Sequence, residues 1–259
     1  MSNSITPALL LRAYRAGIFP MAEDANATEI YWFDPPERTV FPLDAFHVPT
    51  RLRRTIRRQP YRLTLNCAFT EVMRGCAKPN PAMGRGKTWI NEEILTLYSA
   101  LHSQGHAHSI EAWHGERLVG GLYGVQVGGA FCGESMFSNM TDASKICLVA
   151  LVAMLRKQGF ALLDCQFMTP HLRSFGAMTI DRADYQRQLI TASALHCSVF
   201  SSASPAFCSG GTYPGTATGS PSDGKGVLTT GAASDSTPGA DAALAAALTG
   251  FLQEITQAS

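Results

Sequence analysis

The 259-residue sequence has no long uninterrupted hydrophobic run. A transmembrane helix needs about 20 consecutive and mainly apolar residues, and no stretch of this chain comes close to that length. The segment from Met1 to Thr6 also lacks the basic and apolar regions of a secretory signal peptide. We therefore expect a cytoplasmic protein that does not associate with a membrane.

Paired cysteines and metal-ligand spacings are missing as well. The seven cysteines include no CxxC pair, and most of them stand in apolar segments, as reduced core cysteines do. Four histidines between residues 102 and 114 are divided between an expected helix end and an expected strand, without acidic or thiol ligands at a suitable spacing. The sequence thus predicts no disulfide framework, no metal site and no cofactor.

The net charge is only +1, but the charges are unevenly distributed. From Arg51 to Lys87 there are ten basic residues and one acidic residue, whereas the rest of the chain has 11 basic and 19 acidic residues. Arginine's planar guanidinium group suits phosphate oxygens, and five arginines lie between residues 51 and 58. We interpret this stretch as a nucleic-acid-binding surface, with a solvated helix face as the alternative.

The first 60 residues predict a small α+β domain. Residues 7–16 have helical periodicity, and Gly17 with Pro20 would end the helix. An aromatic strand, Tyr31 to Phe33, is cut short by two prolines. Adjacent aromatics usually belong to a core or an interdomain seam, and stacking on a nucleotide base is the alternative.

Residues 61–192 predict a second domain with a mixed, mostly antiparallel sheet flanked by helices. An antiparallel meander of three strands is expected over residues 108–113, 118–127 and 130–137. Residues 143–158 form an almost wholly apolar helix that must be buried between layers. With a strand over 161–167, a short helix and a last strand, the order is β-β-β-α-β-α-β. This α+β order is GNAT-like, that of the acyltransferase fold whose best-known members acetylate amines.

The remaining residues, 193–259, predict a tail outside both domains. Between residues 201 and 240 the composition shifts to Gly, Ser, Thr, Ala and Pro, which predicts disorder. Residues 241–257 can form an alanine-rich helix, although a helix of this length would be marginal alone.

Two acids lie in apolar surroundings within about thirty residues, Glu134 and Asp164. Burying a carboxylate is costly without a partner, so this part of the chain predicts a functional site. Gln166 is two residues after Asp164 and would share its face on a strand. Strict alternation of side chains would place Glu134 and Phe131 on opposite faces of the strand. Gly133 suggests a β-bulge that changes the direction of the strand.

Seven motifs occur together and in order, and they carry a specific resemblance. They are AYRAGIFPM at 13–21, TWI at 88–90, GHAHSIE at 105–111, LVGGLYG at 118–124, GESMFS at 133–138, ASK at 143–145 and DCQ at 164–166. Over residues 7–190 the chain closely resembles the leucyl/phenylalanyl-tRNA–protein transferases. One departure is YWFDPPER at 31–38, where family members usually have two tryptophans followed by Ser-Pro and an arginine.

The resemblance implies that Leu or Phe is transferred from aminoacyl-tRNA to the N-terminal Arg or Lys of a protein, which marks that protein for degradation in the N-degron pathway. We expect the enzyme to be a monomer. The family's aminoacyl pocket corresponds here to Leu122, Phe131, Leu148, Leu151, Leu155 and Leu163. The tRNA-binding residues that we expect are Trp32 and Trp89 at the terminal adenosine, and the basic residues Arg51, Arg53, Arg54, Arg57, Arg58, Arg85 and Lys87.

The implied reaction is the aminolysis of an activated ester. An N-terminal amine has a pKa of about 7.7–8.0, so its deprotonation near pH 7 costs only about 1 to 1.4 kcal/mol. Positioning can contribute roughly 7–11 kcal/mol in favourable intramolecular reactions. We therefore expect Asp164 and Gln166 to orient the amine and relay its proton, and Glu134 to provide the counter-charge that selects a basic acceptor. Alternatively, the two acids are structural and pair with Lys145 or Arg173.

Two other functions stay open. A CoA-dependent N-acetyltransferase of the same fold needs a glycine-rich turn for the pyrophosphate, but residues 139–144 contain no glycine and include an acid. A non-catalytic RNA-binding module would use residues 51–58 and would not need Asp164 and Gln166.

Overall fold

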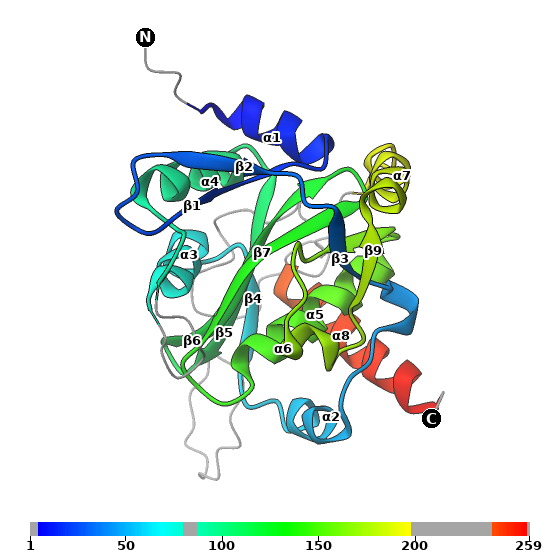
Figure 1. The fold of residues 1–259 in the computed structure, drawn as a ribbon. Helices are drawn as coiled ribbons and strands as arrows, with labels where there is room; N and C mark the ends of the chain where they lie inside the picture. The colour runs from blue at the N-terminus through cyan, green and yellow to red at the C-terminus, as the bar shows by residue number, and fades with distance from the viewer. Residues whose placement is uncertain (1–4, 80–86, 198–239, 258–259) are drawn as a thin grey trace, which may run out of the picture.

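The computed structural model describes residues 5–79, 87–197 and 240–257. Its central element is a seven-stranded sheet in the order β4-β5-β6-β7-β8-β3-β9 (Figure 1). Only β7 and β8 pair in parallel, so the expected α+β class with a mixed, mostly antiparallel sheet is confirmed. The assignment to the acetylating fold stays a prediction. The strands are β3 (Glu37–Phe41), β4 (Arg62–Leu65), β5 (Ala107–His114), β6 (Arg117–Val127), β7 (Ala130–Ser138), β8 (Leu162–Asp164) and β9 (Met178–Asp181).

The three-stranded meander is present as predicted, and β7 contains a bulge. Tyr123 of β6 pairs with Ser135, whereas the next residue, Gly124, pairs with Gly133. Glu134 is therefore the extra residue of β7 and has no partner of its own on β6. Glycine is needed at position 124, because a Cβ there would collide with the Phe131 ring and the Cys132 carbonyl. The bulge that we predicted at Gly133 is confirmed.

The N-terminal segment contributes to two sheets. Helix α1 (Pro7–Arg15) leads into a hairpin of β1 (Phe19–Ala22) and β2 (Ile30–Phe33), which forms a separate two-stranded sheet. Strand β3 instead lies in the large sheet between β8 and β9. Strand pairing thus joins the first 60 residues to the later part of the chain, and the domain boundary at residue 60 stays a prediction.

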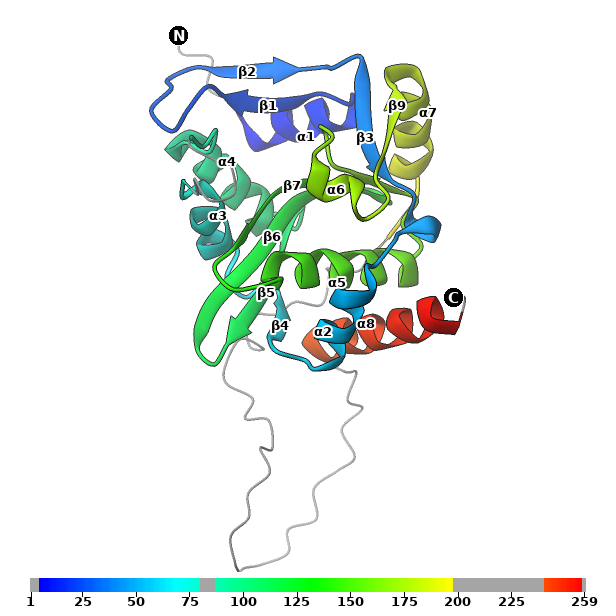
Figure 2. The same cartoon turned by 60° about the horizontal axis from the view of Figure 1, so that its bottom comes forward.

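Helices cover both faces of the large sheet (Figures 1 and 2). One face carries α1, α3 (Phe69–Ala77) and α4 (Glu92–Ser103), and α7 (Arg182–Ser193) packs beside α1 on β3 and β8. The other face carries α5 (Ala143–Lys157). The elements η1 (Leu43–Ala45), α2 (Thr50–Arg57) and α6 (Pro170–Arg173) contribute side chains to the same hydrophobic core as α5. No helix of the described residues is long and apolar enough to cross a membrane.

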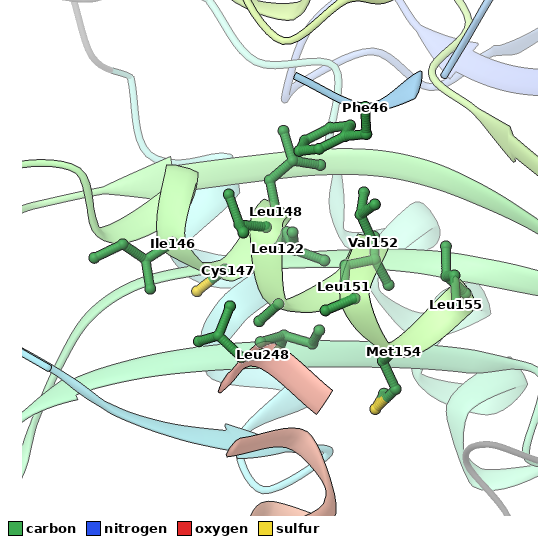
Figure 3. Packing of buried hydrophobic residues seen from close by; sticks show 14 of the residues in the cluster. Phe46, Leu122, Ile146, Cys147, Leu148, Leu151, Val152, Met154, Leu155 and Leu248 are labelled. Atoms are coloured by element: carbon green, nitrogen blue, oxygen red, sulfur yellow. The ribbon is translucent and has the colours of Figure 1, made fainter. Parts of the chain in front are cut away.

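Helix α5 is buried almost all round, as its composition predicted. Every residue from Ile146 to Leu155 is buried. Figure 3 shows the reason: α5 lies between Leu122 of the sheet and Leu248 of the C-terminal helix, with Phe46 packed on a third side.

The C-terminal helix α8 (Ala240–Gln257) forms where an alanine-rich helix was predicted. Its apolar side is buried against α5 and β4, with Leu244 fully inaccessible. Asp241 also accepts a hydrogen bond from the Leu65 backbone N–H at 3.2 Å. This packing stabilises a helix that would be marginal alone. The predicted disorder over residues 201–240 falls almost wholly outside the described residues.

Candidate active site

A cavity of about 560 Å³ lies between β7, the end of β8, α5 and the β1–β2 hairpin. Its lining is mainly apolar, and the polar residues in it include Glu134, Gln166, Ser135, Ser144, Thr169 and His171. The cavity is therefore suited to an apolar group that reacts at a polar edge. Its lining includes Phe19, Pro20, Met21, Trp89, Leu122, Tyr123, Glu134, Met136, Leu148, Leu151, Leu163, Gln166, Phe167, His171 and Leu172.

Four of the six expected pocket residues line this cavity, namely Leu122, Leu148, Leu151 and Leu163. Phe131 and Leu155 do not line it, and their assignment to the pocket stays a prediction. Both are buried in the hydrophobic core. The Phe131 ring fills the space beside Gly124, and Leu155 lies one turn beyond Leu151 on α5 (Figure 3).

Glu134 lies at the edge of the cavity in a network of hydroxyl groups. Its carboxyl accepts hydrogen bonds from Tyr98 Oη at 3.3 Å and from Gln166 Nε2 at 3.4 Å. Tyr98 is in turn hydrogen-bonded to Tyr14, and both tyrosines are buried. Burial raises the pKa of Glu134 to about 8, although the tyrosine hydrogen bonds lower it. Near neutral pH this carboxyl group is therefore mostly protonated.

Asp164 is completely buried behind the cavity. Its carboxylate forms a bidentate ion pair with Arg38, with Nε–Oδ1 and Nη2–Oδ2 distances of 2.9 and 2.8 Å. The Tyr185 hydroxyl donates to the same carboxylate at 3.1 Å. Lys145 pairs instead with Asp142, so the expected structural partner of Asp164 is corrected to Arg38.

Arg38 joins three parts of the chain, and it was not among the site residues expected from the sequence. Its guanidinium lies 4.5 Å from the Phe19 ring centroid and 4.4 Å from that of Tyr185. It also donates a hydrogen bond to the Gly17 carbonyl at 2.8 Å. A sequence signal was present, because Arg38 ends the YWFDPPER segment in which an arginine is usual for the family.

Gln166 is outside the strand on which we expected it. Strand β8 ends at Asp164, and Gln166 has a left-handed backbone with φ of 55°, so the predicted shared strand face is wrong. Its N–H donates to Asp164 Oδ1 at 2.9 Å, and its carbonyl accepts from the Thr39 N–H at 3.0 Å. These two bonds hold a conformation that costs of order 1 kcal/mol and turn the side chain toward Glu134.

The expected tRNA-binding residues lie on two surfaces. Trp89 lines the cavity, and Trp32 is 40% exposed on the β1–β2 hairpin. Helix α2 lies on the opposite side of α5 from this hairpin (Figure 2). The exposed Lys87 forms an ion pair with Asp24, with an Nζ–Oδ2 distance of 3.8 Å. Arg85 falls outside the described residues.

The arginines of α2 and its C-cap residue, Arg58, also differ among themselves. Arg51, Arg54, Arg57 and Arg58 are exposed, whereas Arg53 is half-buried. Arg53 donates to the Val48 and Ile255 carbonyls at 3.0 and 3.2 Å. Arg57 donates to the Thr256 hydroxyl at 2.8 Å, so α8 engages two of these five side chains.

The comparisons with known proteins agree on one family. A family described as leucyl/phenylalanyl-tRNA protein transferase matches residues 40–190, and the N-terminal domain of the same transferase matches residues 3–36. A protein of Maricaulis maris named leucyl/phenylalanyl-tRNA–protein transferase is 55% identical over 183 residues, which cover 71% of this chain and 84% of that protein. A protein of the same name from Nitrobacter winogradskyi is 53% identical over 188 residues, 73% of this chain and 83% of that protein. The chain therefore belongs to the leucyl/phenylalanyl-tRNA protein transferase family.

Proposed function

We propose that this protein is an aminoacyltransferase that moves Leu or Phe from aminoacyl-tRNA to the N-terminal Arg or Lys of other proteins, which creates a degradation signal of the N-degron pathway. The observation that carries the proposal is the apolar cavity with Glu134 and Gln166 at its edge, in a chain of this family. The enzyme would act in the cytoplasm, where its proposed substrates are found, and we expect it to be a monomer.

The leucyl or phenylalanyl side chain would fill the apolar part of the cavity. Leu122, Leu148, Leu151 and Leu163 offer it a surface without charge. Burial of such a side chain contributes about 1.5–3 kcal/mol. A charged aminoacyl group would lose its hydration against these four leucines without gaining a partner among them, so this part of the cavity favours apolar donors.

The acceptor amine would attack the ester carbonyl carbon beside Gln166. A C–N bond forms, the C–O bond to the ribose breaks, and a proton of the amine must reach the departing ribose oxygen. Glu134 has a pKa of about 8, close to that of an N-terminal amine, so the fraction of Glu134 that is ionised near neutral pH can take this proton and return it at little cost. We assign proton transfer to Glu134 and orientation of the amine to the Gln166 amide.

In this proposal Asp164 acts through Gln166 and not by touching the amine. It is fully buried, and its oxygens accept hydrogen bonds from Arg38, Tyr185 and the Gln166 backbone. Its negative charge is balanced by Arg38, and Asp164 is not among the residues that line the cavity. Asp164 therefore fixes the backbone from which the Gln166 side chain extends.

The tRNA would be held at two places. Trp89 in the cavity and Trp32 on the hairpin could stack on the terminal adenosine. The exposed arginines of α2 would contact the phosphate backbone away from the acceptor end. The separation of the two surfaces across α5 suits a long substrate that touches both.

A CoA-dependent acetyltransferase is less well supported by the residues before α5. Asp142 is the N-cap residue of α5, has φ of 62°, and pairs with Lys145 at 2.7 Å. A carboxylate at a helix N-terminus opposes the binding of a pyrophosphate at the same place.

The test combines purified protein, leucyl-tRNA or phenylalanyl-tRNA, and a peptide that begins with Arg. Mass spectrometry should show one added Leu or Phe residue on this peptide and none on a control peptide with an acetylated N-terminus. Gln166→Ala should still bind tRNA but transfer far less. If neither donor gives a mass shift while tRNA binds, the protein is an RNA-binding module and the proposal fails.

A further inference from the structure

A second hollow, of about 210 Å³, adjoins the cavity at Gln166. Gln166 and Phe167 line both spaces, so these two residues separate them. A substrate held at Gln166 could therefore place one group in each space. Among the residues that line the smaller hollow, Glu37 is the only one with a charged side chain.

Strand β3 determines the position of Glu37. Side chains alternate along a strand, so Glu37 and Thr39 share one face while Arg38 points to the other, where it binds Asp164. The Thr39 N–H binds the Gln166 carbonyl at 3.0 Å, and Thr39 pairs with Thr179 of β9 in the lining of the same hollow. Glu37 is thus two residues along the strand from the point that fixes Gln166.

The Glu37 carboxylate is not neutralised by the protein around it. Of the neighbouring acids, Asp34 pairs with Arg182 at 3.0 Å and Asp181 accepts a hydrogen bond from the Asp184 N–H at 2.7 Å. Within the described parts of the chain the Glu37 side chain makes no ion pair and no hydrogen bond. A bound cation would find an unshared charge here.

The walls of the hollow suit the stem of a long side chain. Pro35, Pro36 and Met168 offer apolar surface beside the carboxylate. Arg and Lys combine an aliphatic stem with a charged end group, and they bind well where apolar walls lead to an acid. A short or acidic side chain would use neither feature.

Building on the proposed function, we propose that this hollow binds the side chain of the acceptor's first residue, with Glu37 as the counter-charge for an Arg guanidinium or a Lys ammonium group. The reacting amine must lie at Gln166, and the side chain leaves from the carbon next to that amine. Its pocket must therefore adjoin Gln166 and differ from the cavity that holds the donor side chain. The hollow satisfies both conditions. Glu134 faces the donor cavity and is mostly protonated near neutral pH, which makes it a weaker counter-charge.

The test compares transfer to peptides that differ only in the first residue: Arg, Lys, and citrulline as the uncharged equivalent of Arg. Glu37→Gln should lower kcat/KM for the Arg and Lys peptides about fivefold, mainly through KM, as expected for a partly exposed ion pair. The citrulline peptide and the KM for leucyl-tRNA should be unaffected. Glu116→Gln, in the exposed turn between β5 and β6, is the matched control.

Charge reversal gives a second measurement. Glu37→Lys should reduce transfer to the Arg peptide more than Glu37→Gln does, and it should improve transfer to a peptide that begins with Asp relative to wild type. Equal losses with Arg and citrulline, or no loss with either, would overturn the assignment of Glu37 while wild-type transfer keeps the proposed function intact. If the wild-type protein transfers nothing to any peptide, the proposed function itself fails.

Discussion

Replacement of Glu134 by Gln should make the protein more stable at neutral pH and less active. In the folded protein burial raises the pKa of Glu134 to about 8, whereas the same group in the unfolded chain titrates near 4.5. Between pH 4.5 and pH 8, Glu134 is therefore ionised in most unfolded chains but still protonated in most folded ones. Stability of the wild type therefore falls as the pH rises from 4.5 to 8, and the loss from this group is about 3 kcal/mol at pH 7.

The assay is urea-induced unfolding of both proteins, followed by tryptophan fluorescence at pH 4.5, 6, 7 and 8. The difference in unfolding free energy should be near zero at pH 4.5 and grow toward about 3 kcal/mol in favour of Glu134→Gln at pH 7. Burial also raises the pKa of Glu111 to about 7, but this group is common to both proteins and cancels in the difference.

Glu116→Gln changes an exposed acid and is the control, for which we expect less than about 0.5 kcal/mol at any pH. A difference between Glu134→Gln and wild type that does not change with pH would refute the reasoning, because it would show that Glu134 titrates normally in the folded protein. Transfer activity should fall in the same variant, since an amide cannot take the proton of the amine.

Three further predictions concern the ion pair, the cavity and α2. Arg38→Met leaves Asp164 buried and unpaired, so urea unfolding should show a loss of about 3–5 kcal/mol in the free energy of unfolding. Arg182→Met breaks an exposed ion pair and should lower the same free energy by less than about 1 kcal/mol. Leu151→Phe fills part of the cavity and should lower kcat/KM for phenylalanyl-tRNA more than for leucyl-tRNA; equal losses would contradict the assigned pocket. Charge reversal on α2 should weaken tRNA binding and make it less sensitive to salt. In a plot of log binding constant against log salt concentration, the slope should become shallower by about 0.9 for each phosphate that the variant no longer neutralises. An unchanged slope would exclude α2 from the interface. The residues to reverse are the exposed Arg51, Arg54 and Arg58.

The features that the sequence predicted correctly depend on local pattern. The apolar composition of residues 143–158 required a buried helix, and the turns at residues 114–116 and 128–129 required the meander of β5, β6 and β7. The bulge was foreseen from Gly133 because glycine inside a strand often marks one. The existence of α8 also follows from its alanine content.

The features that were missed depend on contacts between distant residues. Arg38 and Asp164 are 126 positions apart, and the pattern around Asp164 favoured Lys145 or Arg173 as its partner. The left-handed backbone of Gln166 is held by Asp164 and Thr39 and has no signal in the residue type. Phe131 and Leu155 share the apolar character of the four leucines that line the cavity, so the sequence pattern could not show that these two side chains pack in the core outside its lining.

The β-bulge in β7 means that the sheet does not need Glu134 at all. Gly133 and Ser135 pair with consecutive residues of β6, so a chain shortened by this one residue would keep both neighbouring pairs and form a regular ladder. Glu134, to which we assign proton transfer, is in effect a one-residue insertion into an otherwise complete strand. A variant that lacks Glu134 should therefore fold at least as well as the full chain, which would separate the needs of the sheet from those of the proposed proton transfer.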